Sequence, residues 1–399
     1  MNKYVATTNP WPYDFEVLSA QGSYFKARKN GSLKAMFDMS CGISVNNLGH
    51  RDSAIVDAVS RVEEKYAHLM VYGEFDIFEQ SSYAEALCKS LKNVVANTID
   101  DHLQVWFTTS GTEANELAMK LALLTTHRDT FSSVKGGFHG RTLGSLSITS
   151  RESYRKPFMG LVQKEKFQFI DATESYAKML KGNAPAAVIF ELIRGEDGVK
   201  PLSHEEVETL TNYADMLGSL VIVDEVQTGF GRSGTLWASE QYGVESDIMV
   251  LGKACGGGYP MGAVVARKSI FDAISTKNPF THLSTFGGNP IACAAGLAML
   301  NGVSDPLVLK NTHIIENIAK DIFSSRPDHY EIRGKGAMLG LDLNPDKCED
   351  IDKVIDRIWD NGVFVGRVLH DNRTIRLYPP LNSNPTQVLN AFEAIEGSI

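Results

Sequence analysis

Two charged side chains stand directly after apolar runs in the middle of the chain, where a carboxylate and an amine could act together. Asp224 follows the run LVIV, and Lys253 follows IMVLG, 29 positions later. That separation holds one crossover connection, and ligands of an open parallel sheet bind at such strand ends. Lysine is almost never buried without a purpose, and burial would depress its pKa and make it a nucleophilic amine.

A third feature is the segment SGTE, which follows the apolar run VWFTT (105–109). Ser110 and Glu113 have the spacing of a capping box, and a helical pattern follows them. Gly111 lets backbone N–H groups approach an anion, and the hydroxyls of Ser110 and Thr112 add donors, so this helix start could hold a phosphate. Taken alone, the segment is more simply explained as a capped helix that binds nothing, because capping boxes are common.

The three features together match the requirements of pyridoxal 5'-phosphate (PLP). A lysine bonds to this cofactor covalently, a carboxylate keeps its pyridine nitrogen protonated, and a helix start anchors its phosphate. Lys253, Asp224 and the segment around Gly111 supply one group of each kind. The combination predicts a PLP site more strongly than any one of the three does.

The segment GFGRSG (229–234) has the G-x-G-x-x-G spacing of a dinucleotide-binding turn. Asp224 and Glu225 would place negative charge beside the pyrophosphate, and Gln227 and Thr228 push the first glycine several residues past the strand. A dinucleotide-binding oxidoreductase is therefore the remote alternative, and we interpret the glycines as backbone freedom for the loop that leaves the site.

The elements that must position these residues follow an alternating pattern. Short apolar runs predict strands buried on both faces, and helical patterns start near Ala114 and Ser203 between some of them, which indicates a mostly parallel central sheet flanked by helices. The predicted strands are 105–109, 186–192, 220–226, 248–252 and 262–267. We expect a large α/β domain over 46–290, a smaller α+β domain over 291–399, and an N-terminal segment, 1–45, with one or two hairpins that packs with the smaller domain.

Composition limits the class of protein. The 399 residues carry a net charge of −9, which provides no basic surface for nucleic acid or an anionic membrane. The five cysteines are scattered and form no C-x-x-C pair, and no apolar run is long enough to span a bilayer. We expect a cytoplasmic protein without a signal peptide, a metal site, nucleic-acid partners or a membrane anchor.

The chain also resembles the class III (ω-amino acid) aminotransferases, which are PLP enzymes of fold type I and include acetylornithine, ornithine and 4-aminobutyrate aminotransferases. Motifs in the family's order cover most of the chain. They are CGISVNNLGH (41–50), SGTEANELAMKLA (110–122), FHGRTLGSLS (138–147), DEVQTGFGRSG (224–234), GKACGGGYPMGA (252–263), STFGGNPIACAAGLAML (284–300), RGKGAMLGLDL (333–343) and RLYPPL (376–381).

The resemblance implies a role for each cofactor-binding residue. Lys253 would bond to the cofactor and move the substrate proton, Asp224 would pair with the pyridine nitrogen, and Gln227 would bind the 3-oxygen. The others would be Gly111 and Thr112 at the phosphate, Thr285 reaching the same phosphate from the neighbouring subunit, Phe138 stacked on the ring, and His139 beside it. A site shared in this way implies a homodimer.

Substrate contacts are also implied by the resemblance. Arg141 and Arg376 stand at the positions of arginines that bind substrate carboxylates, and Glu196 at that of a glutamate that neutralises the second arginine. Tyr72 is a further candidate contact. The segment ELIRGEDG (191–198) departs from the family's pattern at Leu192, Arg194 and Asp197, and the two added charges could change the substrate that this site serves.

The sequence therefore predicts a transaminase that moves an amino group from an ω-amino acid or related amine to 2-oxoglutarate or another oxo acid, by a ping-pong mechanism. An amino-acid racemase, an aminomutase or a decarboxylase on the same fold is the alternative. A regulator that only binds the cofactor would need a DNA-binding segment, and no basic helix-turn-helix pattern is visible.

Overall fold

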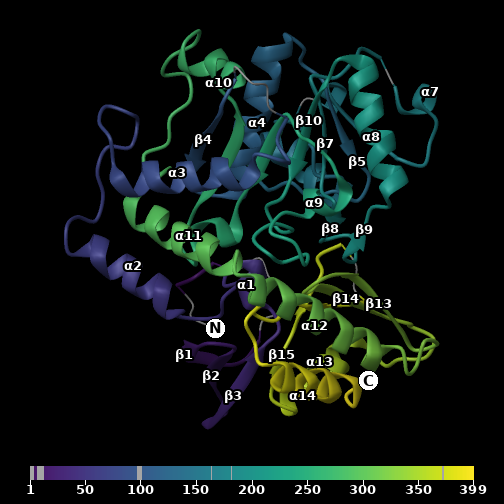
Figure 1. Ribbon diagram of the computed structural model, residues 1–399. Helices are drawn as coiled ribbons and strands as arrows, with labels where there is room; N and C mark the ends of the chain where they lie inside the picture. Colours follow the sequence, from purple (N-terminus) through teal and green to yellow (C-terminus); the bar gives the residue numbers. More distant parts are fainter. Residues whose placement is uncertain (1–3, 7–12, 97–100, 163, 181, 371–372) are drawn as a thin grey trace.

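The computed structural model describes residues 4–6, 13–96, 101–162, 164–180, 182–370 and 373–399. Helices surround a central sheet in the upper half of Figure 1, and a smaller group of strands and helices lies below it. The N-terminal strands lie in this lower half, close to the C-terminal helix. Segments from both ends of the chain thus meet on the same side of the molecule.

The central sheet has seven strands. Their order is β4 (Leu103–Thr108), β12 (Gly262–Arg267), β11 (Ile248–Leu251), β10 (Leu220–Asp224), β7 (Ala187–Phe190), β5 (Phe131–Val134) and β6 (Phe167–Ile170). Only β12 runs against its neighbours, because both of its pairings are antiparallel while the other pairs are parallel. The prediction of a mostly parallel α/β sheet is confirmed.

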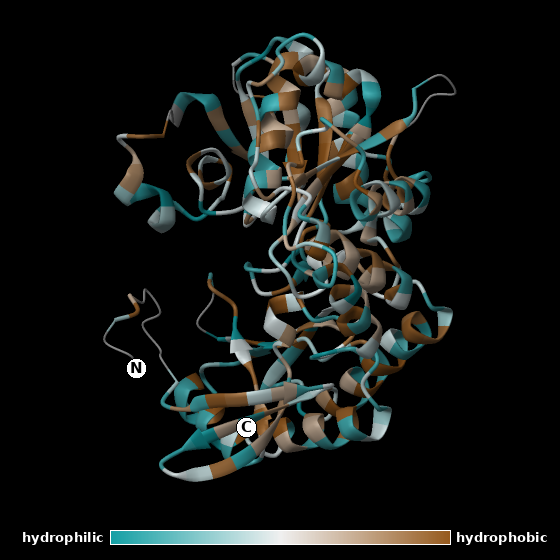
Figure 2. Cartoon of the chain, turned by 90° about the vertical axis from the view of Figure 1, so that its left-hand side faces the viewer, coloured by the Kyte–Doolittle hydropathy of each residue, from teal (hydrophilic) through white to brown (hydrophobic). Residues whose placement is uncertain are grey.

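Helices cover both faces of this sheet, which explains why its central strands β7, β10, β11 and β12 are almost entirely apolar. In β10, Ile222 packs into one core cluster, with α4 (Gly111–Thr126) and α10 (Lys268–Ser275). Val221 and Val223 point the other way, into the larger cluster with α3 (Phe78–Leu91), α8 (His204–Leu217) and α11 (Pro290–Val303). Figure 2 shows apolar, brown strands in the upper half of the molecule with helices beside them.

The smaller part is built on an antiparallel sheet. Its strands, in order, are β13 (Tyr330–Lys335), β14 (Met338–Leu343), β17 (Thr374–Leu377) and β16 (Gly366–Arg367), and its helices are α12 (Pro306–Phe323), α13 (Ile351–Asp360) and α14 (Pro385–Glu396). A third sheet joins β1 (Glu16–Gln21), β2 (Tyr24–Lys29) and β3 (Ser32–Asp38) to β15 (Val363–Phe364). The rings of Phe15 and Trp359 stack 4.2 Å apart beside it.

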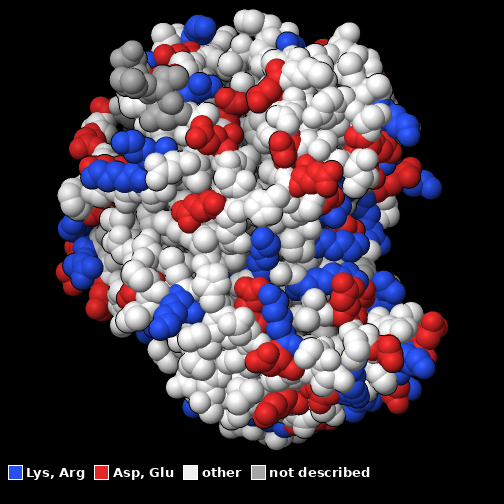
Figure 3. Space-filling model, turned by 45° about the vertical axis from the view of Figure 1, so that its right-hand side comes forward, with Lys and Arg blue, Asp and Glu red and all other residues white. Residues whose placement is uncertain are grey.

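The remaining described elements are short, apart from α2 (Ser53–Glu63). They are α1 (Cys41–Ser44), α5 (Leu143–Ser147), α6 (Glu152–Arg155), α7 (Tyr176–Met179), α9 (Ala238–Tyr242), η1 (Lys156–Phe158), η2 (Lys164–Lys166), η3 (Lys253–Gly256) and the pair β8 (Ile193–Arg194) and β9 (Lys200–Pro201). Within the described ranges no single helix could cross a bilayer; α11 and α12 have the necessary length and composition only as a pair, bent by 69°. Acidic and basic side chains are mixed over the face shown in Figure 3.

Two local expectations need correction. The hydroxyl of Ser110 accepts a hydrogen bond from the Glu113 N–H, but the Glu113 carboxylate turns back to the N–H and hydroxyl of Thr109, so the predicted capping box is only half formed. Strands β5 and β6 were not predicted. Ser132 and Ser133 are buried inside β5, and a strand core made of serines has no apolar pattern to reveal it.

Candidate active site

Asp224 and Lys253 meet at the carboxyl edge of the central sheet. Asp224 is the last residue of β10 and pairs with Val250 of the parallel neighbour β11, and Lys253 follows β11 by two residues. Both line a cavity of about 280 Å³. Its other lining residues are Gly111, Thr112, Asn115, Phe138, His139, Gly140, Arg141, Glu191, Glu196, Val226 and Gln227.

The backbone just before Lys253 lies close to the start of α4. A Cβ atom at Gly252 would lie 3.0 Å from Cα of Gly111, a tight contact that glycine avoids. Lys253 itself has a φ of +50°, a left-handed conformation that is costly for a residue with a side chain. Burial lowers the pKa of Lys253, although the nearby carboxylates of Glu196, Asp224 and Glu191 oppose this effect.

The carboxylate of Asp224 is held by three donors. Its Oδ2 accepts hydrogen bonds of 2.8 Å from Nδ2 of Asn115 and from Nδ1 of His139, and its Oδ1 accepts one of 3.0 Å from the N–H of Val226. Burial alone would lower the pKa of His139, but its hydrogen bond to Asp224 and the charge of that residue outweigh burial and raise it. These three donors fix the orientation of the Asp224 side chain, which lines the cavity.

The start of α4 supplies donors to the same cavity. The first N–H groups of a helix have no partner within it, and Gly111 and Thr112 provide two of them here. The hydroxyl of Thr112 already lies 2.8 Å from that of Thr142 and 2.5 Å from that of Ser145. Ser110 caps the helix and does not line the cavity, so backbone groups rather than hydroxyls are the available donors.

The two candidate substrate arginines differ in environment. Arg376 is 1% exposed, and its NH2 donates 2.8 Å hydrogen bonds to both carboxylate oxygens of Glu196. Burial favours the neutral acid, but the charge of Arg376 outweighs it and lowers the pKa of Glu196. Arg141 is exposed, and its guanidinium lies 3.6 Å from the ring centroid of Tyr154. Nε and NH1 of Arg376 are buried without a hydrogen-bond partner among the described residues.

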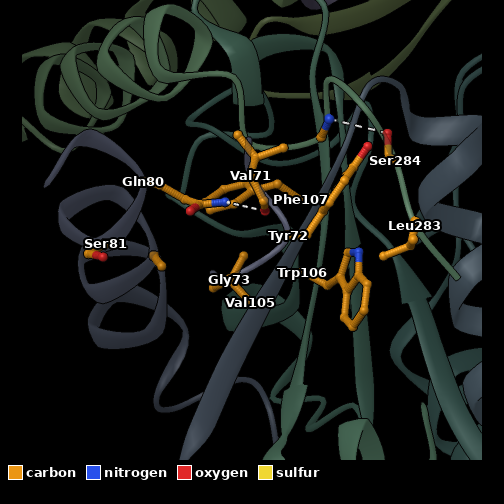
Figure 4. Close-up of a pocket in the computed structure, with 12 residues that line it drawn as sticks. Val71, Tyr72, Gly73, Gln80, Ser81, Val105, Trp106, Phe107, Leu283 and Ser284 are labelled. Atoms are coloured by element: carbon orange, nitrogen blue, oxygen red, sulfur yellow. Dashed lines mark hydrogen bonds between the residues drawn. The ribbon is translucent and has the colours of Figure 1, made fainter. Parts of the chain in front are cut away.

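Tyr72 and Thr285 do not join this cavity within one chain. The Tyr72 hydroxyl lies 3.5 Å from that of Thr285, beside a separate pocket of about 290 Å³ that Tyr72, Trp106 and Leu283 help to line. Figure 4 shows Tyr72 extending toward the segment that carries Leu283 and Ser284. Nine of the predicted residues thus line one cavity. Arg376 lies behind Glu196, and Ser110 caps α4. Tyr72 and Thr285 lie beside the separate pocket.

Four lining residues were missed by the sequence analysis. They are Asn115, Gly140, Glu191 and Val226. Glu191 ends the apolar run of β7, so the rule that selected Asp224 would also have selected it. Its Oε2 accepts a hydrogen bond of 2.8 Å from the N–H of Phe138, and burial raises the pKa of its carboxyl to about 7. Asn115 lies inside a helical pattern, where nothing marks the face that turns to Asp224.

The residues of the cavity fit PLP. It holds an amine of lowered pKa, a buried carboxyl group oriented by three donors, a helix start for a phosphate, and Phe138 and Val226 as apolar surfaces for a ring. A Cβ atom at Gly111 would collide with Val226, so glycine keeps the helix start open to the ring site. Among the described residues, no three His, Cys, Asp or Glu side chains are arranged to hold a metal ion.

Comparisons with known proteins agree with this geometry. The model of the family "Aminotransferase class-III" matches residues 9–399. The chain is 36% identical to an acetylornithine aminotransferase of Methanosarcina mazei over 368 residues, 91% of this chain and 87% of that protein. It is also 36% identical to a putative [LysW]-aminoadipate semialdehyde/glutamate semialdehyde transaminase of Pyrococcus furiosus, over 92% of both chains.

A solved structure shows the same fold. It is a PLP-bound amine transaminase from an uncultivated Pseudomonas species, with a TM-score of 0.87 and 24% identity, covering 100% of this chain and 98% of that one. Family, fold and cavity therefore agree with one another. The chain belongs to the class III aminotransferases and is a PLP-dependent transaminase of fold type I.

Proposed function

We propose that this enzyme transfers the amino group of an ω-amino acid to 2-oxoglutarate by a ping-pong reaction. The observation that carries the proposal is the buried pair of Arg376 and Glu196 beside Lys253. With the pair closed, the site accepts a donor that has no second carboxylate at this position. With Glu196 displaced, Arg376 binds the second carboxylate of 2-oxoglutarate or glutamate.

The donor is proposed from both the site and the relatives. Arg141, stacked on Tyr154, offers a planar fork to a substrate carboxylate at the exposed side of the cavity. One relative is named for acetylornithine, and another for aminoadipate semialdehyde and glutamate semialdehyde; all are amino acid derivatives. We infer that the donor carries a carboxylate for Arg141 and reacts at an amine remote from it.

When bound, PLP supplies an electron-accepting ring that stabilises negative charge at the substrate carbon. Lys253 would hold the cofactor covalently and carry the proton, and its lowered pKa makes a neutral amine accessible. Asp224 would keep a proton on the ring nitrogen, and Gln227 would donate to the 3-oxygen. Phe138 would cover one face of the ring, with His139 beside it. Gly111 and Thr112 would bind the phosphate, together with Thr285 of the partner subunit. Ser110 caps the helix that Gly111 begins.

The proposed assembly is a cytoplasmic homodimer with shared sites. Exposed apolar side chains beside Thr285 support it. Phe286, the next residue, is 57% exposed in the single chain, and Tyr72 is exposed as well. The domain division at 45 and 290 remains a prediction; the pairing of β3 with β15 supports the packing of the N-terminal segment with the smaller domain. Sedimentation equilibrium should give twice the mass of one chain, and a monomer that retains full activity would contradict the shared site.

The proposed chemistry is tested by Lys253→Ala, with the surface variant Lys268→Ala as control. Lys253→Ala should abolish both turnover and the visible absorbance of the lysine-bound cofactor, while Lys268→Ala keeps both. Glutamate formed from 2-oxoglutarate is then measured across a panel of amine donors that includes N-acetylornithine and ornithine. A fully active Lys253→Ala enzyme, or formation of glutamate only from α-amines, would overturn the proposal.

A further inference from the structure

Tyr378 contacts both Gln227, which lines the cavity, and Arg376, which lies behind Glu196. It follows β17 directly, is fully buried, and packs with Ile193, Val199, Met338 and Val368. Its backbone N–H donates a hydrogen bond of 2.7 Å to the carbonyl of Met39. The phenol is therefore fixed by its surroundings and cannot turn away without disturbing the core.

The hydroxyl of Tyr378 points at Gln227. It donates to Oε1 of Gln227 at 3.3 Å, and the described residues offer it no other side-chain acceptor. A side chain at Gly195 would collide with the same Oε1, so this end of the amide is confined between Gly195 and Tyr378. With Oε1 held in this way, the amide NH2 is the end of Gln227 left to donate into the cavity that it lines.

The ring of Tyr378 lies under Arg376. The guanidinium carbon of Arg376 is 5.2 Å from the ring centroid, within the range of a cation–π contact. Arg232, which is also fully buried, lies 5.9 Å from the same centroid. Arg376 thus has Glu196 on its NH2 and the ring of Tyr378 on its face, and these two contacts together fix the orientation of its guanidinium.

We propose that Tyr378 is a positioning residue with two separable tasks: its hydroxyl orients Gln227 toward the cofactor, and its ring orients Arg376 toward the substrate carboxylate. The inference rests on the proposed roles of Gln227 and Arg376. Neither task requires Tyr378 to touch cofactor or substrate. The two tasks predict different effects when the hydroxyl alone, or the whole ring, is removed.

The experiment compares Tyr378→Phe, Tyr378→Leu and the control Tyr330→Phe, which removes another buried phenol hydroxyl, 3.1 Å from Glu396. Cofactor affinity is measured by fluorescence, the absorbance of the lysine-bound cofactor is titrated with pH, and KM is determined for 2-oxoglutarate. Tyr378→Phe should weaken cofactor binding about fivefold and displace the titration midpoint, but change KM less than twofold. Tyr378→Leu should in addition raise KM about tenfold. Tyr330→Phe should leave the cofactor affinity, the titration midpoint and KM unchanged.

The variant Gln227→Ala separates this inference from the assignments on which it rests. It should displace the titration midpoint in the same direction as Tyr378→Phe, and adding Tyr378→Phe to it should have no further effect. If Gln227→Ala shifts the midpoint and Tyr378→Phe does not, the role of Tyr378 is wrong while that of Gln227 holds. If neither shifts it, the role of Gln227 is wrong as well. An unchanged KM in a folded Tyr378→Leu enzyme would overturn the second task.

Discussion

Nδ1 of His139 donates a hydrogen bond of 2.8 Å to Oδ2 of Asp224, and both side chains are buried. A carboxylate can only accept, so this contact fixes the tautomer of the imidazole and places a donor behind the anion. Asp224 would meet the ring nitrogen of the cofactor with its remaining lone pairs. How firmly Asp224 would hold a proton on that nitrogen depends on the donors behind its carboxylate.

The first prediction concerns this donor. His139→Leu removes a charge-assisted hydrogen bond, which contributes about 1.5–3 kcal/mol, so Asp224 should hold the proton on the cofactor less firmly. We expect the single-turnover rate with an amine donor to fall at least tenfold, as measured by loss of the cofactor's absorbance. His139→Asn keeps an N–H near the position of Nδ1 and should retain most of the rate. Equal rates in the two variants would show that the hydrogen bond is unimportant.

The second prediction concerns the buried ion pair. In the unmodified protein the N–H of Leu369 donates to Oε2 of Glu196 at 2.8 Å. Glu196→Gln keeps an acceptor for this N–H but leaves the charge of Arg376 uncompensated. We expect kcat/KM for glutamate, which brings its own carboxylate, to rise relative to that for the ω-amine donor by about tenfold, equivalent to about 1.4 kcal/mol. The two half-reactions are followed separately by stopped-flow absorbance.

A conservative variant of the arginine checks this interpretation. Arg376→Lys keeps the positive charge but loses the planar fork, so the variant should bind 2-oxoglutarate less tightly, seen as a higher KM, without reversing the preference between donors. Glu196→Ala should also destabilise the cofactor-free protein by about 3 kcal/mol, because it leaves a buried charge without its partner. If Glu196→Gln changes both half-reactions equally, the pair has no role in distinguishing substrates.

The third prediction is a pH dependence of stability caused by Glu191. Its pKa is about 7 in the folded protein and 4.5 for an ordinary glutamate, because burial disfavours the charged form. At a pH between these two pKa values, Glu191 is ionised in the unfolded chain but still protonated in the folded one. The free energy of unfolding should therefore fall as pH rises from 4.5 to 7. The difference is about 3 kcal/mol.

Urea unfolding of the cofactor-free protein at pH 5 and pH 7.5 measures this difference. Glu191→Gln cannot ionise, and it should remove most of this component of the pH dependence. Other groups that titrate over the same range contribute to both proteins and largely cancel in the comparison. Glu208→Gln, on the exposed face of α8, should behave like the unmodified protein. Identical slopes for Glu191→Gln and the unmodified protein would contradict the raised pKa.

The sequence was most informative where chemistry follows a buried strand. Asp224 and Lys253 could be found because each ends an apolar run, and the parallel pairing of β10 and β11 then places them side by side. The contact between Glu196 and Arg376 joins residues 180 positions apart, and no local pattern encodes it. Only the family resemblance pointed to that pair.

Other parts could not be predicted for different physical reasons. The serines of β5 are buried because the strand is enclosed on both sides, a tertiary effect that overrides local polarity. Asn115 turns to Asp224 because of how α4 lies on the sheet, and its helical pattern does not encode that orientation. Tyr72 and Thr285 lie outside the cavity of a single chain, so their proposed roles depend on a second subunit.

The last prediction concerns the two charges that depart from the family's pattern, Arg194 and Asp197. In the structure they lie 3.7 Å apart, Lys200 lies 3.5 Å from Asp197, and Arg194 donates to the carbonyl of Lys135 at 2.9 Å. Neither residue lines the cavity. The added cation and the added anion thus neutralise each other outside the site.

We therefore expect Asp197→Asn and Arg194→Gln each to change stability by no more than about 1 kcal/mol, because both side chains are partly exposed and such pairs are screened by solvent. The donor profile, measured as glutamate formed with each amine, should stay within twofold of the unmodified enzyme. The double variant Arg194→Gln/Asp197→Asn should preserve that profile too, since it removes both charges together. A tenfold change in the preference between two donors in any of these three variants would contradict this expectation. It would mean that the segment selects the substrate through the backbone of Glu196, which lies between Arg194 and Asp197 in the sequence.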